Sequence, residues 1–328
     1  MKKSSFIAAL FIGASAMSAC ASGNQSLPAA TNDGTGSTVY FTSEISPEAL
    51  VKVFEALGVN PTGKVAVKIS TGESNRSHHL DPMLIKDLVQ KVDGTLVECN
   101  TLYNGSRGDT ESHLRAVAER GYDKIAPVDI MDGTDTIHIP VKDTKWIHYD
   151  IVGANMPNYD FMINLAHFKG HQMGGFGGVL KNASIGVASS AGKAYIHSAG
   201  QTESGWGHPD QDAFLESMAA AAQGVHDYFK QPGKDIVYIN VMNNMSIDCD
   251  CNGNPATPEL LDMGILASTD PVALDKACLD LVFSHESSDG DNADPLIGRI
   301  KEKHGTHTVE YAEKIGLGSQ QYKLVELK

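Results

Sequence analysis

The sequence predicts an α/β protein with a largely parallel sheet flanked by helices, built as one large domain or as two closely associated subdomains. Short β-branched segments alternate along the chain with segments that have helical spacing of apolar residues, as in folds made of β-α-β units. Ionisable side chains repeatedly follow the predicted strands, and ligands of such sheets bind at the carboxyl ends of the strands. The same pattern therefore predicts both the fold and the place of a functional site.

The N-terminal segment predicts export. Lys2 and Lys3 precede an apolar run, and small residues precede Cys20, as in a secretory signal. Residues 17–20 fit a lipobox, in which Cys20 carries the lipid of a bacterial lipoprotein, and the alternative is an ordinary signal peptide cut nearby. We expect residues 1–20 to be this signal, residues 21–38 to be a flexible tether rich in Ser, Gly, Asn and Thr, and residues 39–328 to form the α/β domain. The protein would then be periplasmic or at the cell surface, held to the membrane by the lipid only.

Charge and cysteine content exclude several protein classes. The net charge of −14 argues against nucleic acid or anionic lipid as a partner. Five cysteines are too few for a disulfide scaffold of this size. Cys249 and Cys251 are too close in sequence to bridge each other without strain, so any bridge would join one of them to Cys99 or Cys278.

The first half of the domain predicts two strands, at residues 64–70 and 95–99. A polar loop carries Arg76, His78 and His79 where the first strand ends, and it is either a wall of a ligand site or a solvated loop. Thr110 is expected to cap a helix that ends before Gly121. The remaining elements of this half are a helix over residues 82–92, a helix over 111–120, and a hairpin of 137–141 with 146–152.

The second half continues the alternation. Asp210 is expected to cap a helix in which Gly224 costs about 1 kcal/mol relative to alanine. Asp270 and Pro271 mark the start of another helix, whose apolar stripe includes Cys278. The predicted strands are residues 159–165, 235–245, 263–268 and 322–327, and the predicted helices are 211–229, 271–284, 296–303 and 309–314.

Residues 163–198 hold the densest chemistry, with three histidines and three lysines. We expect the end of the preceding strand to place His167, Lys169 and His171 in a loop, where side chains that act are usually found. The glycines at 174–178 let backbone N–H groups approach a ligand closely, and Lys181 adds a cation for a phosphate or carboxylate. The alternative is a tight connection after a strand.

Residues 248–259 form a second candidate site with three interpretations. Their carboxylates, amide and glycine follow the spacing of an EF-hand loop, which predicts calcium, although a strand precedes them in place of a helix. The two thiols would suit a softer transition metal such as zinc if a histidine joined them. A structural turn of Asx residues is the third interpretation. The residues concerned are Asp248, Cys249, Asp250, Cys251, Asn252, Gly253 and Glu259.

Four segments together resemble a known family: residues 170–182 (GHQMGGFGGVLKN), 248–253 (DCDCNG), 264–282 and 310–319. They are similar to the bacterial and archaeal "Fe–S centre proteins" of domain of unknown function 362, and the resemblance covers about residue 65 to the C-terminus. Many members carry a ferredoxin-type cysteine cluster after the segment that matches His197. This chain has no cysteine between Cys99 and Cys249, so no iron–sulfur cluster is expected there.

A fainter resemblance is to nickel-dependent lactate racemase, whose cofactor is a nickel pincer nucleotide. It rests on the spacing of His171, Gly175, Phe176, Gly178, Lys181, Gly186 and His197. The resemblance implies that Lys181 holds the cofactor, that His197 ligates nickel and that His171 is an acid/base. Arg76 resembles the arginine that contacts phosphate. The stretch that matches the second acid/base histidine, residues 103–107, has no histidine, so racemisation is not implied.

The sequence therefore predicts an exported enzyme, an isomerase or oxidoreductase, that uses a metal or a Lys181-bound cofactor on a small hydroxylated or carboxylated molecule. The alternatives are a non-catalytic binding protein for an anionic small molecule and a scaffold stabilised by calcium. The cofactor is not identified; nickel, calcium and zinc are the candidate metals. The predicted catalytic residues are His167 and His171; the cofactor-binding residues are Arg76, Lys169, Gly175, Gly178 and Lys181; the metal ligands are His197, Asp248, Cys249, Asp250 and Cys251.

Overall fold

A computed structural model describes residues 36–328, whose strands form one main sheet of eight strands. Five neighbouring pairs are parallel, and β11 is antiparallel to both of its neighbours. The predicted α/β class with a largely parallel sheet is confirmed. In spatial order the strands are β12 (Tyr322–Glu326), β1 (Ser37–Thr42), β11 (Gly264–Ser268), β10 (Asp235–Met242), β7 (Phe161–His167), β2 (Val65–Lys68), β3 (Thr95–Glu98) and β4 (Val128–Ile130).

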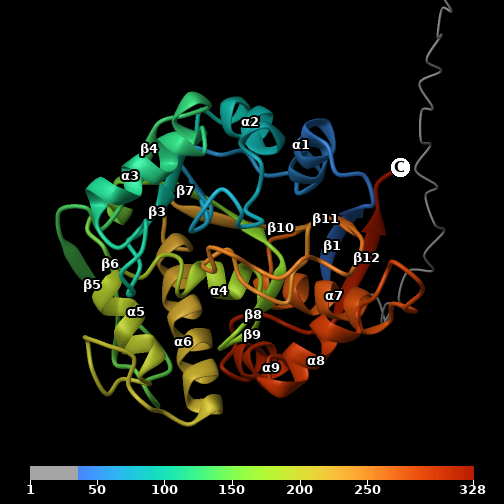
Figure 1. Cartoon of the computed structure of the whole chain (residues 1–328). Helices are drawn as coiled ribbons and strands as arrows, with labels where there is room; N and C mark the ends of the chain where they lie inside the picture. Colours follow the sequence, from blue (N-terminus) through green and yellow to red (C-terminus); the bar gives the residue numbers. More distant parts are fainter. Residues whose placement is uncertain (1–35) are drawn as a thin grey trace, which may run out of the picture.

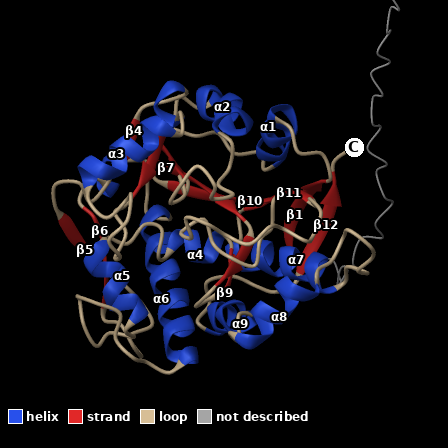
Figure 2. Cartoon of the chain, in the orientation of Figure 1, coloured by secondary structure: helices blue, strands red, loops and turns tan. Residues whose placement is uncertain are grey.

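Helices cover both faces of this sheet (Figures 1 and 2). One face packs against α1 (Pro47–Ala56), α2 (Pro82–Lys91) and α3 (Thr110–Glu119). The other packs against α4 (Val179–Ala183), α6 (Gln211–Phe229) and α7 (Pro271–Phe283), with α8 (Asp294–Glu302) and α9 (Thr306–Lys314) outside them. The smaller elements are α5 (Ser190–His197), two 3₁₀ turns (Tyr122–Lys124 and Met156–Asn158), the hairpin of β5 (Thr136–Pro140) and β6 (Tyr149–Gly153), and the hairpin of β8 (Lys169–His171) and β9 (Gly175–Gly177).

The central strand β7 shows how the layers form. Every residue of this strand is buried, as expected for a parallel strand covered on both faces. Phe161 and Ile163 pack with the α1 and α2 side, and Met162 packs with the opposite side. Asn164 faces α4, where its side-chain amide donates to the Val179 carbonyl at 3.0 Å. This buried polar contact ties the strand to the short helix that carries Lys181.

Most predicted elements are present. The helix from 211 to 229 is found with the predicted bounds, and the Asp270 carboxylate caps α7 by accepting the Val272 and Ala273 N–H groups. Gly224 lies where β5 crosses α6, since a Cβ there would come within 3.1 Å of the Val141 side chain. This glycine therefore allows close packing, which compensates for its low helix propensity.

Three local predictions are wrong. The cap of α3 is Asp109 and not Thr110, because the Asp109 carboxylate accepts the Ser112 N–H. The strand β7 extends to His167, and the residues after it form the β8–β9 hairpin and not an open loop. β1 begins at Ser37, which pairs with Tyr322, so the predicted tether overlaps a strand. The bridges that the sequence left possible are not formed among the described residues, whose four cysteines are free: Cys99, Cys249, Cys251 and Cys278.

The predicted signal peptide, its Cys20 and most of the tether lie outside the described residues, so export and lipidation stay predictions. Within residues 36–328, none of the helices combines the length and the apolar character that a membrane span requires.

Candidate functional site

A cavity of about 290 Å³ lies at the carboxyl edge of the parallel strands. Lys68, Glu98 and His167 are the last residues of β2, β3 and β7, and all three line it. The other walls come from the β8–β9 hairpin, from α4 and α5, and from the long segment that follows β10. The sheet thus brings residues far apart in sequence to one site, at the edge where such folds bind ligands.

The lining of this cavity is strongly basic, although the whole chain is acidic. Its charged residues are one carboxylate, Glu98, and five cations: Lys68, Arg107, Lys169, Lys181 and Lys193. Arg107 pairs with Glu98 at 3.2 Å and also with Glu73 outside the cavity. Lys169 pairs with Asp250 at 2.7 Å. The three other lysines form no ion pair with any residue of the described chain, so the cavity has an excess of positive charge.

The three unpaired lysines differ in their surroundings. The Lys68 ammonium donates to the Ile69 carbonyl at 2.6 Å and to Asn182 at 3.1 Å, and burial lowers its pKa to about 8. The Lys193 ammonium donates to the Ala188 carbonyl, and burial lowers its pKa as well. Lys181 has no hydrogen-bond partner within residues 36–328. Each ammonium has donors left for a ligand.

The carboxylate of Asp250 organises the floor of the site. It accepts hydrogen bonds from His167 Nδ1 at 2.9 Å and from Lys169 at 2.7 Å. Burial alone would raise the pKa of Asp250, but Lys169 and then His167 outweigh it and hold this pKa well below its usual range. His167 Nε2 faces the Asn243 carbonyl at 2.5 Å. Both ring nitrogens of His167 therefore face acceptors, and the contact with His167 helps to hold the Asp250 carboxylate in place.

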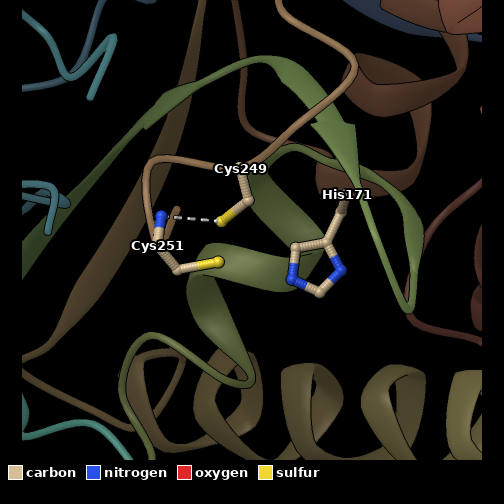
Figure 3. Close-up of side chains that lie close together, drawn as sticks. All are labelled: His171, Cys249 and Cys251. Atoms are coloured by element: carbon tan, nitrogen blue, oxygen red, sulfur yellow. Dashed lines mark hydrogen bonds between the residues drawn. The ribbon is translucent and has the colours of Figure 1, made fainter. Parts of the chain in front are cut away.

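A compact cluster of His171, Cys249 and Cys251 lies on the cavity wall. Their ligand atoms all lie within 4.8 Å of one another, and no other such group of histidine, cysteine or carboxylate side chains occurs among the described residues. Figure 3 shows the three side chains converging, with one ring nitrogen of His171 turned toward the sulfur atoms. The Cys251 N–H also donates to Cys249 Sγ at 3.3 Å.

The environment of the cluster favours one thiolate. Hydrogen bonding from the Cys251 thiol lowers the pKa of Cys249 well below its usual range, with Lys181 and His171 acting in the same direction against burial. The same contact raises the pKa of Cys251. The two sulfur atoms therefore share one proton more readily than they hold two. Burial lowers the pKa of His171, and Lys181 adds to this effect.

His197 contributes a free acceptor to the cavity. Its Nδ1 donates to the Lys193 carbonyl at 2.7 Å, which leaves Nε2 without a proton in the neutral ring. The ring stacks on Phe214 with centroids 4.8 Å apart and meets Trp206 edge to face. Burial lowers the pKa of His197 to about 3, so the ring stays neutral at physiological pH.

The structure brings together most of the predicted site residues: His167, His171, Lys169, Gly178, Lys181, His197, Cys249 and Cys251 line the cavity, and Asp250 lies directly behind it. Arg76 is exposed and does not line the cavity. Gly175 faces Gly305 instead, and a Cβ at Gly175 would lie 2.8 Å from the Gly305 Cα, so this glycine serves packing against α8 and α9. His78 and His79 also lie outside.

The carboxylates of the EF-hand pattern do not converge. Asp248 accepts the Ala256 N–H at 3.0 Å and lies 3.7 Å from Arg299. Asp250 is held by His167 and Lys169, and Glu259 accepts from Asn292 at 3.3 Å. The carboxylates of this pattern are therefore not arranged as calcium ligands in the structure, because each is engaged elsewhere and two of them by cations.

Sequence reasoning missed Lys68, Glu98 and Asn182. Of these three, Lys68 could have been found from the sequence. Lysine is seldom fully buried, so a lysine at the end of an otherwise apolar strand indicates a polar site nearby. Asn182 lies one residue after Lys181 and joins Lys68 to Asn164, with 2.6 Å between its amide and the Asn164 oxygen. Only the packing of α4 on the sheet reveals that contact.

The fold and the site together define an α/β protein with a basic small-molecule cavity at the carboxyl edge of its sheet. A family model described as "Domain of unknown function (DUF362)" matches residues 65–280. The chain belongs to this family, as its motifs predicted. No curated protein matches the sequence.

Two solved structures are similar to this chain at 12% sequence identity. One is a protein from Thermotoga maritima, with a TM-score of 0.44, covering 71% of this chain and 57% of that one. The other is the lactate racemase apoprotein from Thermoanaerobacterium thermosaccharolyticum, with a TM-score of 0.42, covering 75% of this chain and 57% of that one. The chain thus spans less than two thirds of each, and likeness at this level gives no information about activity.

The residues present do not fit the complete nickel pincer nucleotide. Lys181 and His197, which the resemblance to lactate racemase implies as cofactor contacts, both line the cavity. Arg76, expected at the phosphate, is exposed and outside, and Arg107, which does line the cavity, is paired with Glu98 and Glu73. Among the described residues that line the cavity no arginine is free, so the arginine contact to phosphate that the resemblance implies is not found there.

Proposed function

We propose that this protein is a metal- or cofactor-dependent enzyme that binds a small carboxylated or hydroxylated anion in the basic cavity. The observation that carries the proposal is the set of three lysines, Lys68, Lys181 and Lys193, that line a buried cavity without carboxylate partners. Burying a charge without a partner is costly, and an anionic ligand offsets that cost. In a chain with a net charge of −14, such a cluster is a local feature and not a consequence of composition.

The cavity also contains groups suited to a hydroxyl and to chemistry. His197 Nε2 accepts a hydrogen bond from a hydroxyl group while the lysines hold a carboxylate. The His171, Cys249 and Cys251 cluster provides reactive atoms on the neighbouring wall. A partly enclosed site with few polar groups at fixed positions is typical of small-molecule enzymes.

The test is anion binding measured by thermal unfolding, with glycolate, lactate, malate and inorganic phosphate as probes. We expect at least one anion to raise Tm, because binding to the folded state stabilises it. Lys181→Gln should lower the affinity for that anion by about tenfold or more, since a charge-assisted hydrogen bond contributes about 1.5–3 kcal/mol. Lys91→Gln is the control, because Lys91 pairs with Glu55 on the surface and does not line the cavity. Unchanged Tm with every anion, or unchanged affinity in Lys181→Gln, would contradict the proposal.

A non-catalytic binding protein for an anion is the second candidate, because the same lysines support it. Conversion of the bound anion, followed by NMR, separates the two. We also propose, from the signal sequence, that the protein acts outside the cytoplasm and is held to the membrane by a lipid on Cys20.

A further inference from the structure

We propose that Cys249, Cys251 and His171 form a soft-metal centre whose open coordination position faces the basic cavity. This inference deepens the proposed function, since it rests on the same cavity and names the metal site of the enzyme. Among the metal sites that the sequence suggested, the centre is the thiol site, and the structure identifies His171 as the histidine that joins the two cysteines. It uses neither the carboxylates of residues 248–259 nor His197.

The first support is the ligand set. Two thiolates and one imidazole favour Zn²⁺, Cu⁺ or Ni²⁺, whereas Ca²⁺ and Mg²⁺ prefer oxygen ligands. Asp250 lies between the two cysteines in sequence, but its carboxylate is turned away into contacts with His167 and Lys169. The ligands that remain for a metal are therefore sulfur and nitrogen.

The second support is the set of contacts that holds the β8–β9 hairpin and the segment after β10 in place. The Gly170 N–H, next to His171, donates to the Ser246 carbonyl at 2.8 Å. The Asp250 carbonyl accepts the Glu73 N–H at 2.8 Å, which fixes the chain between the two cysteines. Lys169 joins the hairpin to Asp250. The backbone on both sides of the cluster is thus held before any metal binds, as a preorganised site requires.

The third support is charge balance. A divalent ion with two thiolates is neutral, and the nearby Lys181 and Lys169 offset any further negative charge on the ligands. All three ligands line the cavity, so three protein ligands leave a fourth position of a tetrahedral ion open to it. An anion held by the lysines would meet the metal at that position.

The hydrogen bonds of His171 indicate which of the three ligands binds the metal most weakly. Its Nδ1 accepts the Gly174 N–H at 2.8 Å and the Met173 N–H at 3.2 Å, which turns Nε2 toward the sulfur atoms. The neutral ring therefore carries its proton on Nε2, and a metal binds this nitrogen only when the proton moves to Nδ1 and the Gly174 and Met173 N–H groups give up their contacts with the ring. Most metal-binding histidines donate from the second nitrogen instead. We expect the thiolates to supply most of the affinity and His171 to be the weaker ligand.

The experiment is titration of the reduced, chelator-treated and desalted full chain with Co²⁺, followed by competition with Zn²⁺. We expect one equivalent of Co²⁺ to bind with sulfur-to-cobalt charge-transfer absorption, and Zn²⁺ to abolish that absorption. Cys249→Ser and Cys251→Ser should each lose the absorption, whereas His171→Ala should keep it with affinity reduced by about tenfold or more. Cys278→Ala is the matched control, because Cys278 is buried in α7 away from the cavity and should leave the titration unchanged.

A second measurement uses only the parent protein, so it does not depend on whether the variants fold. In the parent protein, Zn²⁺ should protect Cys249 and Cys251 from iodoacetamide, as mapped by peptide mass. Absence of Co²⁺ and Zn²⁺ binding, binding without sulfur absorption, or no protection of these two cysteines would overturn the inference. The anion assay above separates the two proposals: anion binding without metal binding defeats only the metal centre, and metal binding without anion binding defeats the proposed function.

Discussion

At the scale of single residues, the cavity depends on lysines that are buried without carboxylate partners. The free-energy cost of burying a charged ammonium is clearest for Lys68, because burial lowers its pKa to about 8. An unfolded lysine has a pKa of about 10.4, so the unfolded state binds more protons between these two values. The charged form of Lys68 therefore destabilises the fold below about pH 8, and this cost is relieved as the pH rises. A bound anion would stabilise the charged form instead.

The pKa of Lys68 gives a pH dependence for ligand binding. Anion affinity should be full near pH 7 and should fall as the pH rises through about 8, because Lys68 then loses its positive charge. Isothermal titration calorimetry at a series of pH values from 6.5 to 9.5 measures the anion affinity at each pH. In Lys68→Met the affinity should be lower at pH 7 and should change less across this range. A parent affinity that stays constant to pH 9.5 would contradict a role for Lys68.

Residue chemistry explains which site residues could be predicted. His171, Lys181 and His197 fall in one segment, so their density in the sequence was visible. The pairing of Asp250 with His167 and Lys169 was not, because it joins residues about eighty positions apart. That contact engages the Asp250 carboxylate and one ring nitrogen of His167, and neither engagement is visible from the sequence. Side-chain types identify a site more readily than they assign roles within it.

At the scale of elements, the short β8–β9 hairpin and the segment after β10 build the site together. The two approach so closely at Gly170 that a Cβ there would lie 2.3 Å from the Ile247 carbonyl oxygen. Only glycine allows this approach, because the contact is with backbone and cannot move aside cheaply. The glycines after β7 therefore serve packing of the site walls as well as access to the cavity.

Gly170→Ala tests this junction. The added methyl group should push the segment carrying Cys249 away from the hairpin and lower the free energy of unfolding by about 1–3 kcal/mol. Gly298→Ala in α8 is the control, because no atom lies within 4 Å of its Cβ position and alanine should stabilise the helix by about 0.5–1 kcal/mol. Urea unfolding of both variants measures the difference. If Gly170→Ala proved as stable as the parent, the close junction would be refuted.

Elements were predicted best where local signals agree. Asp270 and Pro271 start α7 as expected because capping and proline geometry act within a few residues. The antiparallel direction of β11 was not predicted, because it depends on how residues 243–263 return across the end of β10. The β8–β9 hairpin was missed for a related reason. Its strands have three residues each, too few to show a period in sequence.

At the scale of the whole molecule, an acidic protein places a basic cavity at the carboxyl edge of its sheet. A net charge of −14 disfavours polyanions as partners, whereas the basic lining of the cavity favours the small anion that we propose as its ligand. Membership in the DUF362 family agrees with the fold, and the site itself carries the functional argument. We propose that this cavity holds a small anion next to a metal bound by thiolates.

The most direct measurement is a crystal structure with anomalous diffraction at the zinc edge, from crystals grown with Zn²⁺ and the anion that raises Tm most. We expect one strong anomalous peak between Cys249, Cys251 and His171, with the anion among Lys68, Lys181 and Lys193. Zinc bound only at surface histidines such as His304 and His307, with no anion in the cavity, would contradict it.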